Sequence, residues 1–128
     1  MATIKEARPM LAVRDLEAAK TWWADTFGLK PARDLGDQGV YYEVGSSNVF
    51  VYPSQFAGTN QATAMGLNVD DLDATVAELR AAGMTFEEYD FPGLKTENGI
   101  ATLDTGDGTI RVAWFKDPDG NIISIGDE

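Results

Sequence analysis

The pattern of apolar and polar positions occurs twice along the chain. Residues 11–18, Leu-Ala-Val-Arg-Asp-Leu-Glu-Ala, match residues 67–74, Leu-Asn-Val-Asp-Asp-Leu-Asp-Ala, at an offset of 56 positions. Because similarity within one chain indicates a repeated structural unit, we expect two modules of the same plan, at about residues 1–56 and 62–128. A chain of 128 residues is the size of one domain, so we expect both modules to belong to a single domain.

Each module is predicted to open with a short strand and to continue into a helix. Apolar runs predict strands at residues 9–13 and 65–69. Asp15 and Asp71 follow these runs and are typical N-cap residues, because a carboxylate accepts hydrogen bonds from the free N–H groups of the first helical turn. The apolar residues that follow recur at helical spacing: Leu16, Ala19, Trp23 and Phe27 in the first module, and Leu72, Val76 and Leu79 in the second.

Strands are predicted after each helix, which we expect to end at Gly28 and Gly83. The expected strands cover residues 33–37, 40–44 and 48–52 in the first module, and 85–88, 100–104, 109–116 and 121–125 in the second. Turn-forming residues separate them, among them Asp-Pro-Asp-Gly-Asn at 117–121. Each module therefore has a βαβββ plan, and the fold class is α+β.

The last strand of each module is apolar at nearly every residue, which is typical of a strand covered on both faces. Strand alternation predicts which residues face away from the helices. If the leucines and valines of the first strands pack under the helices, the residues that face away are Arg8, Met10, Ala12, Ala64, Gly66 and Asn68, with Val49, Val51, Ile122 and Ser124 on the last strands. Phe50, Ile123 and Ile125 are then expected to face the helices.

Composition removes several kinds of chemistry. The chain has no cysteine and no histidine, so it has no thiol nucleophile, no thiolate metal site and no Ser-His pair. Its formal net charge of −11 disfavours nucleic acids and anionic membranes and favours a cationic ligand. No apolar run approaches 18 residues, and Met1–Lys5 does not open a signal peptide, so we expect a cytoplasmic protein.

Several strings together resemble one family. They are Val13-Arg-Asp-Leu16, Trp22-Trp-Ala-Asp25, Phe27-Gly-Leu29 and the hairpin from Phe115 to Asn121. With the internal repeat, they resemble the vicinal oxygen chelate superfamily of glyoxalases, extradiol dioxygenases, fosfomycin-resistance enzymes and bleomycin-resistance proteins. The resemblance covers almost the whole chain. It implies two βαβββ modules that form one curved mixed sheet with the helices on its convex side, and it implies a homodimer.

Enzymes of that superfamily hold a divalent metal with His or Glu residues on the first and last strands of the modules. The corresponding positions here are Arg8, Val51, Ala64 and Ser124. None is a good metal ligand, and arginine stays protonated. We therefore expect no metal and no cofactor. A member of this kind is most similar to the bleomycin-resistance proteins, which are acidic homodimers that sequester a large cationic drug in grooves rich in aromatic residues.

Three functional hypotheses follow. The first is a metal-free protein that binds, and in the resistance case sequesters, a cationic or aromatic small molecule; its expected ligand-binding residues are Arg8, Met10, Tyr42, Val51, Asn68, Trp114 and Ser124. The second is a lyase or isomerase with a site that lacks histidine; it uses either an acid, for which Glu43 is the candidate, or a metal held by oxygen ligands. The third is an interaction module without a small ligand. No catalytic residue is assigned.

Each candidate also has an ordinary structural interpretation. Arg8 suits an ion pair with one of the many acids, and the tyrosines suit any sheet. Trp23 falls on the apolar helix stripe and is expected in the core, whereas the pattern leaves the face of Trp114 open. The segment 117–121 carries acids at calcium-ligand spacing, but Ile122 stands where a calcium loop needs glycine, so a hairpin turn is expected.

Overall fold

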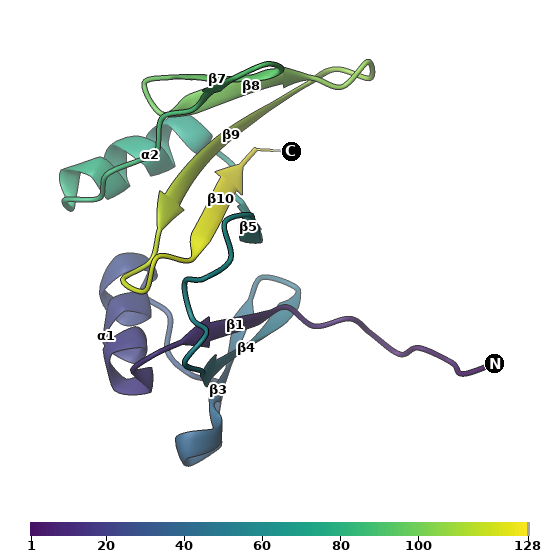
Figure 1. Ribbon diagram of the computed structural model, residues 1–128, viewed down its shortest axis with the longest axis vertical. Helices are drawn as coiled ribbons and strands as arrows, with labels where there is room; N and C mark the ends of the chain where they lie inside the picture. Colours follow the sequence, from purple (N-terminus) through teal and green to yellow (C-terminus); the bar gives the residue numbers. More distant parts are fainter. Residues whose placement is uncertain (128) are drawn as a thin grey trace. The chain divides into compact units, whose positions relative to one another are not determined.

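The computed structural model describes residues 1–127 and divides into two compact units, Met1–Thr59 and the chain from Asn60 onward. The first unit contains β1 (Met10–Val13), α1 (Leu16–Phe27), β2 (Arg33–Asp34), the short 3-10 helix η1 (Gly36–Gln38), β3 (Val40–Val44) and β4 (Ser47–Pro53). The second contains β5 (Thr63–Asn68), α2 (Leu72–Ala81), β6 (Asp90–Phe91), β7 (Leu94–Glu97), β8 (Ile100–Asp104), β9 (Thr109–Lys116) and β10 (Ile122–Gly126). Within each unit the helix lies to one side of the strands (Figure 1).

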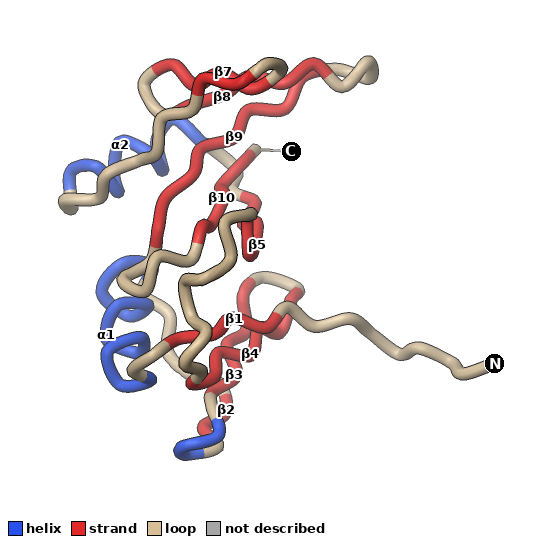
Figure 2. Tube along the Cα trace, in the orientation of Figure 1, coloured by secondary structure: helices blue, strands red, loops and turns tan. Residues whose placement is uncertain are grey.

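The strands of the first unit form one mixed sheet in the order β1-β4-β3-β2, with β1 parallel to β4. Helix α1 begins where predicted, because the Asp15 side chain accepts a hydrogen bond from the Ala18 N–H. It ends at Gly28, which has the left-handed φ of 68° that glycine tolerates best. Figure 2 shows η1 as a short helix close to β2; it replaces the second half of the strand expected at 33–37.

The second unit forms a mixed sheet in the order β5-β10-β9-β8-β7-β6. Asp71 caps α2 by accepting from the Ala74 N–H, as predicted. The helix ends at Ala81 with Ala82 as its C-cap, so the expected glycine cap at Gly83 is displaced by one residue. In the described part of the chain, no helix is long and apolar enough to cross a membrane.

The α+β class and the two copies of a strand, a helix and further strands are confirmed. The pairing differs from the prediction of a single sheet: there are two sheets, one in each unit. The reason lies in the first strands, since β1 and β5 each pair with the last strand of their own unit and leave their other edge without a partner strand. That both modules form a single domain stays a prediction.

The prediction of a strand at residues 85–88 is wrong. Only Phe86 makes an isolated bridge, to Phe115 in β9, and a hairpin of β6 and β7 follows instead. Thr96 in β7 explains the departure, because its hydroxyl oxygen accepts a hydrogen bond from the Tyr89 N–H at 2.8 Å. The Thr96 N–H also donates to the Tyr89 carbonyl at 2.9 Å. These bonds hold residue 89 against β7 rather than in a strand continuous with 85–88.

The buried side of the first sheet is identified by Trp23 of α1, whose ring contacts Tyr42 of β3 at 6.1 Å between centroids. Tyr42 pairs with Val49, and Val51 pairs with both Val40 and Leu11, so all of these residues share the side of the helix. In the second unit, the Arg111 guanidinium of β9 donates a hydrogen bond to the Asp73 carboxylate of α2. Every second residue of β9 from Arg111 on, including Ala113 and Phe115, therefore lies on the side of the helix. We call these sides helix-covered and the opposite sides helix-free.

Candidate functional site

The helix-free face of the first sheet carries a row of aromatic rings. Tyr41 of β3 pairs with Phe50 of β4, and their ring centroids are 4.7 Å apart. Phe50 in turn stacks on Tyr52 at 5.9 Å with an angle of 5° between the ring planes. Met10 of β1 pairs with Phe50 and is exposed beside it. The row therefore offers half-buried aromatic surface on the side that α1 does not cover.

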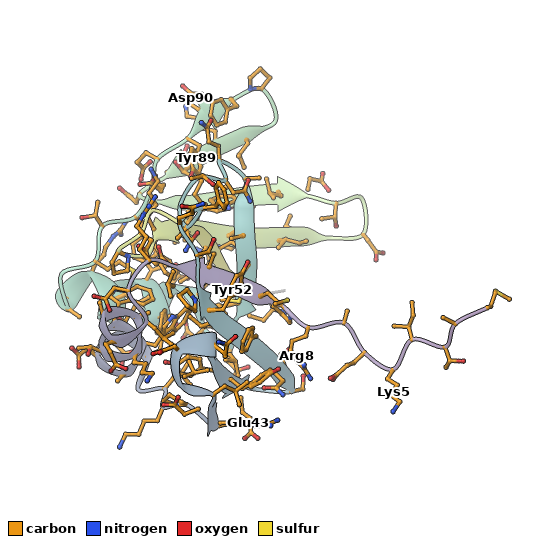
Figure 3. The ribbon with its side chains drawn as sticks, turned by 60° about the horizontal axis from the view of Figure 1, so that its bottom comes forward. Lys5, Arg8, Glu43, Tyr52, Tyr89 and Asp90 are labelled. Atoms are coloured by element: carbon orange, nitrogen blue, oxygen red, sulfur yellow. The ribbon has the colours of Figure 1, made fainter. Side chains whose placement is uncertain are left out.

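Two guanidinium groups adjoin one end of this row. The Arg8 guanidinium carbon lies 5.0 Å from the Tyr41 ring centroid, and that of Arg33 lies 5.9 Å from it. Arg33 is in β2 and pairs with Tyr41, whereas Arg8 comes from the segment before β1. Figure 3 shows Arg8 where the N-terminal segment joins the first unit, with Lys5 farther out on the same segment. Arg8 also forms an ion pair with the exposed carboxylate of Glu6.

A second aromatic cluster belongs to the helix-free face of the second sheet. Trp114 pairs with Ser124 across β9 and β10, and its indole N–H donates to the Thr63 hydroxyl at 3.2 Å. The Tyr89 ring meets Trp114 edge to face at 5.5 Å and stacks with Phe91 at 5.7 Å. The Phe91 side chain is exposed, at 57%. We call Tyr89, Phe91 and Trp114 the Trp114 cluster.

Acidic residues lie around the Trp114 cluster. Glu88 accepts a hydrogen bond from the Thr96 hydroxyl at 2.8 Å, and Asp90, next to Tyr89 in the chain (Figure 3), pairs with Lys95 across β6 and β7. Burial raises the pKa of Tyr89, and the Glu87 carboxylate raises it further, while Lys116 acts in the opposite direction. The surroundings of the Tyr89 hydroxyl therefore disfavour negative charge, and Glu87 is paired with Lys116 at 3.3 Å.

The structure brings three of the expected ligand-binding residues to one face. Asn68 pairs with Gly126, and Ser124 pairs with Trp114, so Asn68, Trp114 and Ser124 share the helix-free face of the second sheet. Arg8 and Met10 adjoin the helix-free face of the first sheet. The other two, Tyr42 and Val51, do not lie on either helix-free face.

Tyr42 and Val51 lie on the helix-covered side, at 2% and 1% exposure. Val51 was predicted to face away from the helices and Phe50 to face them; this prediction is wrong. The parallel register explains it, because Leu11 pairs with Val51 while Met10 pairs with Phe50. The Tyr42 hydroxyl is buried without a hydrogen-bond partner, and burial raises its pKa. Neither side chain is available to a ligand on the helix-free face.

The register also corrects one of the four positions that correspond to metal ligands. Gly66 pairs with Ser124 in the second unit, and the matching pair in the first unit is Met10 with Phe50, so Phe50 replaces Val51. The resulting set of Arg8, Phe50, Ala64 and Ser124 offers a guanidinium, a ring, a methyl group and a hydroxyl. These donors do not fit a divalent metal. In the described residues no group of three or more Asp and Glu side chains is placed to hold one.

Two carboxylates bear on acid–base chemistry. Glu43 is exposed on β3, so it lacks the apolar surroundings that an acid–base residue needs. Asp117 is the buried one, and burial raises its pKa. Its oxygens accept hydrogen bonds from the backbone N–H groups of Asp119 and Asn121 and from the Asn121 side chain. It therefore holds the predicted hairpin turn between β9 and β10 in place.

Two open grooves in the described residues contain none of the expected ligand-binding residues. One, of about 360 Å³, lies beside α2 and includes Arg80 and Arg111. Both arginines are engaged there, Arg111 by Asp73 and Arg80 by the Asn98 carbonyl. The other, of about 610 Å³, lies beside the start of α1 and includes Lys20, which is paired with Glu17 and Asp34.

Sequence reasoning included Trp114 but missed other aromatic residues on both faces. Phe50 was assigned to the wrong side, and Arg33, Tyr89 and Phe91 were not among the expected ligand-binding residues. One signal was present for Phe50: the repeat offset of 56 equates Met10 with Gly66, and this fixes the partner position on the last strand. No such signal exists for Tyr89, whose place depends on Thr96 and Trp114.

The structure resembles solved structures across nearly its whole length. A glyoxalase / bleomycin resistance protein from Catenulispora acidiphila DSM 44928 has a TM-score of 0.63 and 23% identity, covering 95% of this chain and 96% of that one. A lactoylglutathione lyase from Agrobacterium tumefaciens has a TM-score of 0.68 and 18% identity, covering 98% and 95%. A bleomycin-binding protein complexed with bleomycin has a TM-score of 0.65 and 19% identity, covering 98% and 99%.

These identities establish similarity of fold. A comparison with curated protein sequences gives no match. The family itself is shown by a family model, which matches residues 6–125 and so covers most of the chain. The repeat, the α+β units and this match agree, and the chain belongs to the Glyoxalase/Bleomycin resistance protein/Dioxygenase superfamily.

Proposed function

We propose that this protein binds a cationic aromatic small molecule without the help of a metal ion, at the helix-free face of the second sheet. The observation that carries the proposal is the Trp114 cluster, in which the exposed Phe91 ring stacks on Tyr89 beside acidic residues. Aromatic faces attract cations and planar rings, and carboxylates nearby add to the attraction for a cation. The net charge of −11 draws cations toward the protein as well.

The donor set at the corresponding metal positions supports the metal-independent part of the proposal. Phe50 and Ala64 supply no ligand atom, and arginine does not release its proton to become one. Binding then depends on stacking, charge and hydrogen bonds. Asn68 and Ser124, on the same face as Trp114, supply an amide and a hydroxyl for the polar part of a ligand. A solved neighbour of this fold is complexed with bleomycin, which makes bleomycin a suitable natural-product probe.

Calorimetric titration of chelator-treated protein with three naphthalenes tests the proposal. Naphthylmethylammonium is a cation, naphthylmethanol is neutral and naphthoate is an anion, and the ring is the same in all three. We expect the cation to bind, and we expect Phe91→Leu to weaken that binding by roughly 2- to 30-fold, because the cation–π contribution is lost. Phe56→Leu is the matched control, since Phe56 is 68% exposed in the loop before β5, outside the Trp114 cluster.

Asp90→Asn removes one carboxylate and leaves the rings in place. It should therefore weaken binding of the cation and leave binding of the neutral compound unchanged. A cation that does not bind, or binding that Phe91→Leu and Phe56→Leu change equally, would contradict the proposal. Bleomycin is then titrated into the same variants. A difference between Phe91→Leu and Phe56→Leu that appears for the cationic naphthalene should appear for bleomycin also.

A further inference from the structure

The helix-free face of the first sheet differs in charge from that of the second. Its aromatic row ends at Tyr41, and the guanidinium groups of Arg8 and Arg33 both lie within 6 Å of that ring centroid, at 5.0 and 5.9 Å. In a chain with 21 acidic and 10 basic residues, this end of the row brings two guanidinium groups to one tyrosine ring. This arrangement shares no residue with the Trp114 cluster.

We propose that this face of the first unit binds an aromatic carboxylate. The two ends of such a ligand match the two parts of the face. The carboxylate is planar, and guanidinium groups bind it through paired N–H donors. The ring stacks along Phe50 and Tyr52, whose ring planes already lie parallel to each other at an angle of 5°.

The acidic groups near the two arginines leave this binding open. Arg8 pairs with Glu6, but both side chains belong to the N-terminal segment before β1, and the Glu6 side chain is 61% exposed. An exposed pair of this kind contributes little, so a ligand carboxylate can replace it. Arg33 has no ion pair within 4 Å among the described residues, and Glu43, on the same face, has none either. Asp34, the neighbour of Arg33, is on the opposite side with Lys20.

The aromatic row is held in place by its surroundings. A Cβ atom on Gly39 would lie 2.6 Å from the Phe50 ring and 2.6 Å from the Val51 carbonyl oxygen, so the backbone at Gly39 closely approaches the ring. Tyr41 contacts the Phe50 ring and both guanidinium groups. A ligand ring therefore meets a surface that is already ordered, which lowers the entropy cost of binding.

Calorimetric titration with naphthoate, naphthylmethanol and naphthylmethylammonium tests the site. We expect Arg8→Gln and Arg33→Gln each to weaken naphthoate binding about 10-fold and to leave binding of the cation within about 2-fold. Lys5→Gln is the matched control, because it makes the same change of charge on the same N-terminal segment (Figure 3). Lys5→Gln should leave naphthoate binding within about 2-fold. Added salt should weaken naphthoate binding.

The guanidinium geometry has its own test. Arg33→Lys keeps the charge but loses the planar pair of donors, so it should recover only part of the affinity. Failure of naphthoate to bind, or equal effects of Arg8→Gln, Arg33→Gln and Lys5→Gln, would overturn the proposal. A second copy of the chain could instead occupy the face. Light scattering decides this: a dimer that Phe50→Ser dissociates, together with no naphthoate binding, would also overturn it. Because the cation is measured in the same variants, failure here does not depend on the Trp114 cluster.

Discussion

Gly39 provides the sharpest test of how the aromatic row is built. Its φ of 138° and ψ of −176° lie in a region that is nearly restricted to glycine, where another residue costs on the order of 1–3 kcal/mol. An added Cβ would also lie 2.6 Å from the Val51 carbonyl oxygen. This oxygen belongs to the backbone of β4, which is paired with β3, so moving it would disturb the pairing of the two strands. Overpacking of this kind costs about 1–3 kcal/mol more. Gly39→Ala should therefore lower the free energy of unfolding by about 2–6 kcal/mol.

Gly36→Ala is the matched control in the same loop. Gly36 also has a positive φ, of 67°, but an added Cβ would meet nothing within 4 Å. Its cost is then only that of the left-handed backbone, about 1–2 kcal/mol. Urea unfolding followed by far-ultraviolet circular dichroism measures both variants, and each kcal/mol moves the midpoint by roughly 0.3–1 M. Equal destabilisation by the two substitutions would refute the close approach of Gly39 to Phe50 and Val51.

Three further predictions concern the helix-covered core and the charged groups. Val51→Ala should lower the free energy of unfolding by about 2–3 kcal/mol in urea, because the two methyl groups lost are fully buried. Asp117→Ala should cost about 1–3 kcal/mol in the same assay, since Asn121 and its neighbours lose their acceptor. The hydrogen bond from Arg111 lowers the pKa of Asp73 from its ordinary value of 3.8. The ionised Asp73 therefore stabilises the folded state fully above pH 3.8, and this stabilisation is lost as the pH falls through the lowered pKa. Asp73→Asn should therefore flatten the dependence of thermal stability on pH below about 4, and an unchanged profile would contradict this.

The parts that sequence predicted well depend on neighbouring residues. Asp15 and Asp71 cap helices with residues three positions away, and the apolar spacing of Trp23 places it in the core. The parts it missed depend on distant pairing. The run Val49-Phe50-Val51-Tyr52 is apolar throughout, so alternation alone does not say which side is buried; the parallel register with Leu11 decides it.

The same reason explains why only part of the candidate site was foreseen. Alternation predicted that Ser124 faces away from the helices but left the face of Trp114 open, and the pairing of Trp114 with Ser124 decides it. Tyr89 was not foreseen, because its position depends on hydrogen bonds to Thr96, seven residues farther along the chain. Arg33 joins Arg8 only through the pairing of β2 with β3 at Tyr41.

The most direct test of the account is a nuclear magnetic resonance titration that follows the indole N–H signals. The three tryptophans belong to two elements: Trp22 and Trp23 are in contact in α1, and Trp114 of β9 donates its indole N–H to Thr63 on the helix-free face of the second sheet. Trp114→Phe assigns its signal. Titration of chelator-treated protein with naphthylmethylammonium should shift the Trp114 signal in a saturable manner and leave in place the signal of Trp23, which lies on the helix-covered side of the first sheet. Equal shifts of both signals, or none with the cation present in excess, would contradict metal-independent binding at the Trp114 cluster.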